Sequence, residues 1–232
     1  VYTWAYAVCQ FFSGALLDRL GARKVLLPAV AFVTLGAFIF ANAASFEILL
    51  LSQFVLALGA CAGFIGAGYV GGQWFGMAKF SFMFGLVQLA ASISSAFSQN
   101  LISWLLGFWS WQTLSNGMGV VGILLFALSV LVIRNPAPVA QEDNQGIGAF
   151  VTSVLGSILR VARIRHVWHA AFIGGLLFGI LLACGVVWAP KLMAVRGMDP
   201  SHATIAASLI WLGLAVGCLV VPKWSDVARR RK

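Results

Sequence analysis

The sequence predicts an all-α polytopic membrane protein, on its composition and on the pattern of its apolar residues. The 232 residues are 61% hydrophobic and 9% charged, whereas a soluble domain carries about 25% charged residues. The apolar residues form continuous runs of about 20, the length with which an α-helix crosses a bilayer. Membrane-spanning strands would instead alternate apolar and polar residues. The prediction is therefore a bundle of membrane-spanning helices.

Seven apolar runs are expected to be membrane spans. Polar or glycine-bearing segments separate them, and each is long enough, or nearly so, to cross the hydrocarbon core. In chain order, they cover residues 1–17, 25–43, 46–71, 80–108, 111–133, 167–189 and 202–221.

The basic residues predict which ends of these spans face the cytoplasm. If the first span runs inward, 13 of the 15 lysines and arginines fall in inner loops, and only Lys191 and Arg196 fall in outer loops. This asymmetry is typical of a membrane protein that obeys the positive-inside rule. It places segments 18–24 and 135–166 in the cytoplasm. It also accounts for the net charge of +9 without a nucleic-acid partner, because the charges alternate with spans instead of gathering on one soluble face.

A short charged turn between the first two runs carries the most specific motif. It resembles the loop between the second and third helices of the major facilitator superfamily, whose pattern is G-x-x-x-D-R-x-G-R-R/K. Ala22 departs from this pattern at a position that is usually basic. The residues that fit the pattern or continue its basic end are Gly14, Asp18, Arg19, Gly21, Arg23 and Lys24.

A second turn, near residue 226, is similar to the first. Asp226 corresponds to Asp18, and the basic cluster that contains Arg230 corresponds to Arg23 and Lys24. The resemblance implies two parallel pseudo-repeat halves joined by a cytoplasmic linker. On this alignment, the chain is a fragment equivalent to helices two to eight of twelve. Its expected parts are an N-terminal bundle (1–134), a linker (135–166) and the start of a C-terminal bundle (167–232).

The linker is expected to contain an amphipathic helix. Asn135-Pro-Ala-Pro138 ends the preceding helix. Apolar residues then recur at helical spacing from Phe150 to Ala162, opposite a polar face that includes Thr152 and Arg160. This pattern favours a helix on the inner membrane surface. It could act as a strap between the two bundles or as a passive connector.

The charged turn has two interpretations. The resemblance implies a cytoplasmic latch between the two bundles, built from Asp18, Arg19, Arg23 and Asp226 and remade as the bundles move. A carboxylate at a helix end can bind an arginine or backbone N–H groups. In that reading, Gly14 and Gly21 permit close backbone approach and a sharp turn. In the alternative reading, these residues only set the topology.

Polar residues inside the apolar runs are candidates for a solute cavity, because an unpaired polar group in lipid is unfavourable. Hydrogen bonding to a neighbouring helix is the alternative explanation. Gly59-x-x-x-Gly63 and Gly68-x-x-x-Gly72 instead predict close helix packing. The cavity candidates are Tyr6, Gln10, Gln53, Gln88, Ser92 and Gln99.

The resemblance implies a secondary active transporter that moves a small solute by alternating access. The sequence Tyr6-Ala-Val-Cys-Gln10 is similar to the organic-anion and sugar-phosphate permease branch. Hydrolase and phosphate-loop motifs are absent, so we expect no enzymatic activity, cofactor or metal. The expected partners are a small-molecule solute, a coupling ion (H⁺ or Na⁺) and the lipid bilayer. We expect the full-length protein to be a monomer in a bacterial inner membrane. The alternatives are a non-transporting sensor or receptor and a decayed remnant of a transporter.

Overall fold

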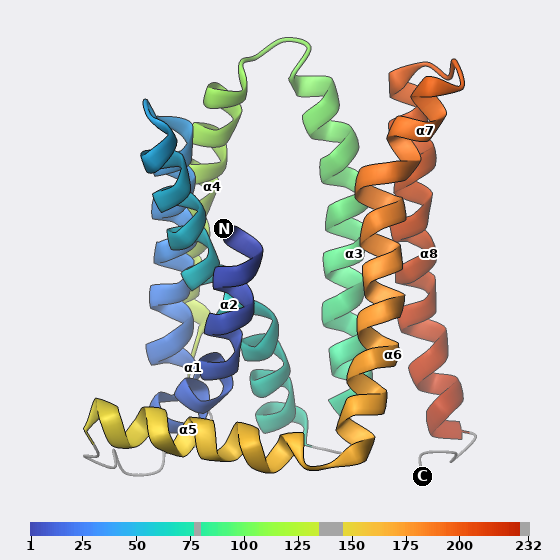
Figure 1. Ribbon diagram of the computed structural model, residues 1–232. Coiled ribbons are helices and arrows are strands. Elements are labelled where there is room, and N and C mark those ends of the chain that lie inside the picture. The colour runs from blue at the N-terminus through green and yellow to red at the C-terminus, as the bar shows by residue number, and fades with distance from the viewer. Residues whose placement is uncertain (77–79, 135–145, 228–232) are drawn as a thin grey trace. The chain divides into compact units, whose positions relative to one another are not determined.

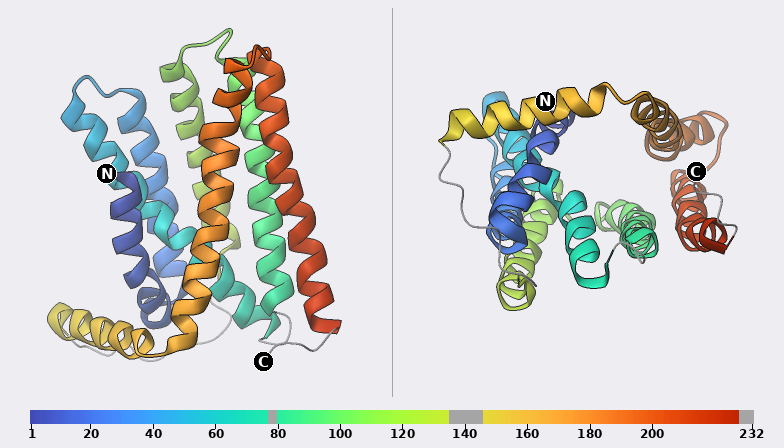
Figure 2. Two further views of the ribbon diagram at one scale, coloured as in Figure 1. Left: turned by 45° about the vertical axis from the view of Figure 1, so that its right-hand side comes forward. Right: turned by 90° about the horizontal axis from the view of Figure 1, so that it is seen from below.

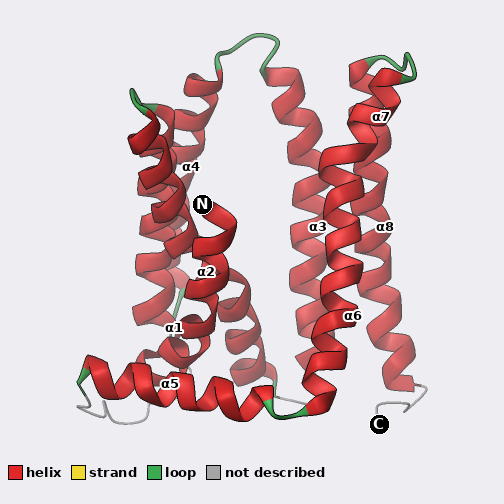
Figure 3. Cartoon of the chain, in the orientation of Figure 1, coloured by secondary structure: helices red, strands yellow, loops and turns green. Residues whose placement is uncertain are grey.

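The computed structural model describes residues 1–76, 80–134 and 146–227, and Figure 3 shows them as helices joined by short loops. Six of these helices are long and apolar enough to cross a membrane. The predicted all-helical bundle is therefore confirmed. In chain order, the elements are α1 (Tyr2–Ala41), α2 (Phe46–Phe75), α3 (Phe80–Leu105), α4 (Trp111–Val132), α5 (Ile147–Ala162), α6 (Arg165–Leu182), η2 (Ala183–Trp188), α7 (Ala189–Val195) and α8 (Pro200–Val227).

The first two predicted spans both lie in α1, which reverses its direction at Gly21. There the backbone leaves the helical region, with φ 79° and ψ 165°, a conformation that is essentially confined to glycine. Figure 1 shows the first half of α1 descending and its second half rising beside α2. The sharp turn expected from the charged motif is therefore present, and one 40-residue element contains two antiparallel segments.

Helices α2 and α4 begin where the sequence predicts. Ser45 precedes α2, and its side chain accepts a hydrogen bond from the backbone N–H of Ile48. Ser110 precedes α4 and accepts one from Thr113 at 3.2 Å. Serine is a preferred N-cap because its oxygen satisfies an N–H group that has no partner within the helix. These caps fix both helix starts, at Phe46 and Trp111.

The chain divides into two compact units. The first contains Val1–Phe80 and Trp109–Gly156, and the second contains Ser81–Phe108 and Ser157–Lys232. This grouping by contact places most of α3 with α6 to α8. It differs from the division along the chain at residues 134 and 166, because helices that are distant in sequence can pack together. The expected domain boundaries remain a prediction.

In the first unit, glycines bring the backbones of α1 and α2 close together. A Cβ at Gly59 would collide with the Ala29 carbonyl oxygen and would lie 2.7 Å from the Val33 backbone nitrogen. At Gly36 it would lie 2.7 Å from the Leu56 side chain. Small residues allow such approach in membranes, where association depends on van der Waals packing. The predicted packing role is confirmed for Gly59, whereas a Cβ at Gly63 would meet nothing within 4 Å.

Helix α4 packs against the second half of α1 in the same way. A Cβ on Gly119 would lie 2.7 Å from the ring of Phe38, and one on Gly122 would lie 2.6 Å from Thr34 Oγ1. Asn42 Nδ2 donates a hydrogen bond to Asn116 Oδ1 at 3.0 Å near the ends of both helices. Close packing and side-chain hydrogen bonds therefore hold α4 on α1.

In the second unit, α3 and α8 run side by side in opposite directions (Figures 1 and 2). A Cβ at Gly85 of α3 would lie 2.7 Å from the carbonyl oxygen of Cys218 on α8. The buried residues of α3 are Gly85, Ser92 and Ala96, and those of α8 include Ala207, Trp211 and Ala215. Both sets recur at helical spacing, so each helix buries one face.

A π-helical segment, which the apolar pattern does not predict, interrupts the expected span 167–189. Residues Ala183–Trp188 form η2, directly before Pro190 near the start of α7. Proline has no N–H, and its ring clashes with the carbonyl four residues earlier. A wider turn relieves that clash, and π-turns are frequent at functional sites.

Candidate functional site

The charged turn holds its arginines against neighbouring elements of the first unit. The guanidinium carbon of Arg19 lies 5.3 Å from the centroid of the Phe150 ring on α5, a cation–π contact. Arg23 Nη2 donates a hydrogen bond to the Val130 carbonyl oxygen at 3.3 Å. That carbonyl lies in the last turn of α4, where a cation interacts favourably with the helix dipole. Both arginines therefore connect the turn to elements more than 100 residues away along the chain.

Other residues of the motif take different positions. Asp18 and Lys24 are exposed, whereas Gly21 is buried. A Cβ at Gly14 would meet no atom within 4 Å. Asp226 lies within α8, but its side chain is not described, and Arg230 lies outside the described residues. A latch between Asp18 and the second turn therefore remains a prediction.

The cavity candidates fall into two sets, one in each unit. In the first unit, Gln10 Nε2 donates a hydrogen bond to the Tyr6 hydroxyl at 3.4 Å. The Tyr6 ring stacks on that of Tyr2, with 5.9 Å between centroids. The structure thus brings Tyr6 and Gln10 together on one face of α1. Gln53 is half-buried on α2.

The second set lies on α3. Ser92 is fully buried, and its hydroxyl donates to the Gln88 carbonyl at 2.8 Å, so its polarity is satisfied within its own helix. Gln88 and Gln99 are half-buried, but the Gln99 Oε1 atom is buried and has no hydrogen-bond partner within residues 1–76, 80–134 and 146–227. Gln99 thus retains an unused acceptor inside the unit.

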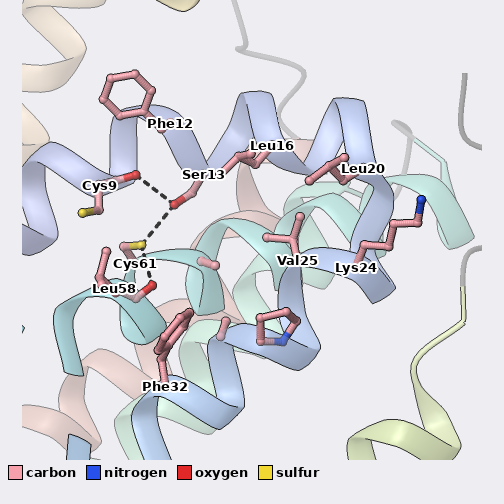
Figure 4. A pocket seen from close by; sticks show the side chains of 13 residues that line it. Cys9, Phe12, Ser13, Leu16, Leu20, Lys24, Val25, Phe32, Leu58 and Cys61 are labelled. Atoms are coloured by element: carbon pink, nitrogen blue, oxygen red, sulfur yellow. Dashed lines mark hydrogen bonds between the residues drawn. The ribbon is translucent and has the colours of Figure 1, made fainter. Parts of the chain in front are cut away.

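A pocket of about 320 Å³ lies in the first unit, between the two halves of α1 and α2. Figure 4 shows Lys24 at one end and Cys9, Ser13 and Cys61 towards the other. Ser13 Oγ lies 3.0 Å from the Cys9 carbonyl and 3.2 Å from Cys61 Sγ, so it links α1 to α2. The wall between these ends is mainly apolar. The remaining lining residues are Phe12, Leu16, Leu20, Val25, Pro28, Ala29, Phe32, Leu58 and Ala62.

Sequence reasoning missed this pocket, because its walls come from segments about 50 residues apart. The spacing of Cys9 and Ser13, four residues apart on one helical face, was the available signal. Within the part of the chain that the structure describes, no group of three or more His, Cys, Asp or Glu residues could hold a metal ion. The pocket offers apolar contacts along its wall and polar groups at Ser13 and Lys24, a combination that suits a small organic molecule.

Comparison with known proteins gives a family match and several relatives. The family described as Major Facilitator Superfamily matches residues 1–232. The probable galactarate/D-glucarate transporter GarP of Escherichia coli K12 is 27% identical over 58% of this chain and 32% of its own length. The similarly named GudP of Bacillus subtilis is 28% identical over 58% of this chain and 31% of its own length.

A further relative matches nearly the whole chain. The uncharacterized MFS-type transporter YfiU of Bacillus subtilis is 26% identical over 97% of this chain and 48% of its own length. The chain therefore spans about a third to a half of these three relatives. No solved structure matches it.

Proposed function

Because this chain belongs to the major facilitator superfamily, we propose that its protein is a secondary active transporter of a small organic solute. The observation that carries the proposal is the family match over residues 1–232, together with relatives whose names identify them as transporters. The transporter relatives also favour a carrier over an enzyme. A solute site between two bundles and alternating access complete the proposed mechanism.

The proposed solute is an organic acid of the galactarate or D-glucarate type. Two of the relatives carry these names, and the polar faces of α1 and α3 offer amide and hydroxyl groups to a hydroxylated solute. Coupling to H⁺ or Na⁺ is part of the proposal. A non-transporting sensor has no comparable support, since the named relatives are transporters.

We place the protein in a bacterial inner membrane as a monomer, with segments 18–24 and 135–166 in the cytoplasm. The excess of basic residues in these loops supports that orientation. The latch formed by Asp18, Arg19 and Arg23 with Asp226 would stabilise one state of the alternating cycle. The contacts of Arg19 with Phe150 and of Arg23 with α4 support a structural role for this turn.

Uptake by proteoliposomes that contain the gene's full product tests the function. Labelled galactarate should accumulate above its external concentration when a proton or sodium gradient is imposed. Dissipating the gradient with an ionophore should abolish accumulation. Binding of galactarate without transport, under either gradient, would favour the sensor. The absence of both binding and transport would remove this solute class.

A further inference from the structure

Gln99 on α3 buries a hydrogen-bond acceptor that no group in the described part of the chain satisfies. A buried acceptor without a donor loses its hydrogen bond to water and gains nothing in return. Nearly all buried polar groups in proteins have a partner, so the exception calls for a physical reason. The reason lies either in the surroundings of Gln99 or in a group that binds there.

The register of α3 and α8 defines these surroundings. The helices are antiparallel (Figure 1), and Gly85 of α3 meets the Cys218 carbonyl of α8. Fourteen residues further along α3 is Gln99, and an equal rise along α8 leads back to Thr204. Gln99 therefore lies level with the first turns of α8, where Ala203, Ala207 and Ser208 are buried.

Three polar residues near this level of α3 and α8 donate hydrogen bonds to their own helices. On α3, Ser95 Oγ donates to the Ala91 carbonyl at 2.9 Å. Asn100 Nδ2, beside Gln99 in sequence, donates to the Ala96 carbonyl at 2.9 Å. On α8, Ser208 Oγ donates to the Ile205 carbonyl at 2.6 Å. These donors are engaged within their own helices, while Gln99 Oε1 is buried and has no partner among the described residues.

We propose that Gln99 Oε1 accepts a hydrogen bond from a hydroxyl group of the transported solute and selects hydroxylated acids over deoxy acids of the same length. This inference rests on the proposed transport function. A carboxylate offers no proton to an acceptor, whereas a hydroxyl does. An ammonium donor would lack a counter-charge on α3, since Phe80–Leu105 contains no charged residue.

The physical basis for this selectivity is the cost of an unmatched polar group. A site built to bond a hydroxyl discriminates against an analogue without one, because the buried acceptor is then left unpaired. Galactarate and adipate are six-carbon dicarboxylates that differ by the hydroxyl groups of galactarate. Gln99 therefore favours galactarate, and an apolar side chain at this position removes its part of the preference.

Equilibrium binding of both acids to the purified full-length protein tests the inference. We expect Gln99→Met, which has a similar length but no acceptor oxygen, to weaken galactarate binding about tenfold and leave adipate binding unchanged. Asn100→Leu is the matched control, because the Asn100 amide bonds its own helix. It should leave the ratio of the two affinities unchanged. If Gln99→Met does not fold, Gln99→Ala is measured in the same way.

The outcomes separate this inference from the transport function. An unchanged affinity ratio in a folded Gln99 variant would mean that trapped water satisfies the oxygen, and it would overturn the inference even if uptake continues. Failure of the wild-type protein to bind either acid would also overturn it. If galactarate binds with a preference that depends on Gln99 but does not accumulate in vesicles, the inference is supported and only the transport function fails.

Discussion

Gly59 and Gly63 are four residues apart on α2, yet their surroundings differ. A Cβ at Gly59 would meet backbone atoms of α1, whereas one at Gly63 would meet nothing within 4 Å. Backbone atoms cannot move aside as the end of a flexible side chain can. We therefore expect Gly59→Ala to destabilise the protein by about 1–3 kcal/mol, the usual cost of overpacking. Its thermal unfolding temperature in detergent should fall, while that of Gly63→Ala should stay near the wild-type value.

Asp18 is an exposed carboxylate beside the turn, so its replacement should affect function more than folding. If it forms the latch, Asp18→Asn should lower the uptake rate at least about tenfold, the usual effect of losing a hydrogen bond to a charged group. Membrane insertion should be unchanged. Glu47→Gln removes another exposed carboxylate, in the first turn of α2, and serves as the control. Normal uptake by Asp18→Asn would show that this residue contributes only to topology.

The residues also show how far a sequence can predict a site. Tyr6 and Gln10 are four positions apart, so helical spacing alone places them on one face, and they are hydrogen-bonded in the structure. The contact of Ser13 with Cys61 joins two elements, and no local pattern encodes it. Gln99 was selected for its polarity, but its unsatisfied oxygen depends on the packing of the second unit. The sequence thus predicts which residues share a face of one helix, whereas their contacts with other helices can be known only from the tertiary structure.

At the scale of the element, the reversal in α1 depends on a single backbone conformation. Gly21 adopts φ 79° and ψ 165°, which costs a residue with a side chain of the order of 1–3 kcal/mol. Gly21→Ala should therefore reduce the thermal stability of the purified protein by about that amount. Gly14→Ala, in open space within the same helix, should be tolerated. Equal stability of the two variants would mean that the turn can relax.

Helix α5 has a buried side and an exposed apolar edge. Val154 is 4% exposed, whereas Leu159 is 64% exposed, and Thr152 and Arg160 are exposed polar residues. If this helix lies on the inner membrane surface, a spin label at Leu159→Cys should be accessible to oxygen dissolved in lipid. A label at Thr152→Cys should be accessible to a water-soluble nickel complex. Equal accessibility to the nickel complex at both positions would place α5 away from the bilayer.

The elements differ in how well the sequence predicts them. The starts of α2 and α4 follow from a serine placed before an apolar run, since the cap is a local interaction. The turn at Gly21 follows from glycine and charge between two runs. The π-helical segment Ala183–Trp188 escaped prediction, because hydropathy reports burial in the membrane and not the hydrogen-bond register of the backbone.

At the scale of the whole molecule, many large apolar side chains face outward in both units. Leu124, Leu131 and Leu177 are each more than 60% exposed, a pattern that would cause a soluble protein to aggregate. A bilayer accounts for it, because lipid covers such surfaces. The same reasoning makes orientation testable, since the ends of the spans and the turns between them reach water on one side of the membrane or the other.

The charge asymmetry predicts opposite sides of the membrane for Arg23 and Arg196, both of which are exposed. In a variant with its four native cysteines replaced by serine, a membrane-impermeant maleimide should label Arg196→Cys in intact cells. It should label Arg23→Cys only after permeabilisation. The expectation follows from the positive-inside rule, because loops that carry more lysines and arginines are retained more strongly on the cytoplasmic side. The reverse labelling pattern would show that the protein has the opposite orientation in the membrane. The arginines of the turn would then face the outside, where they could not form a cytoplasmic latch.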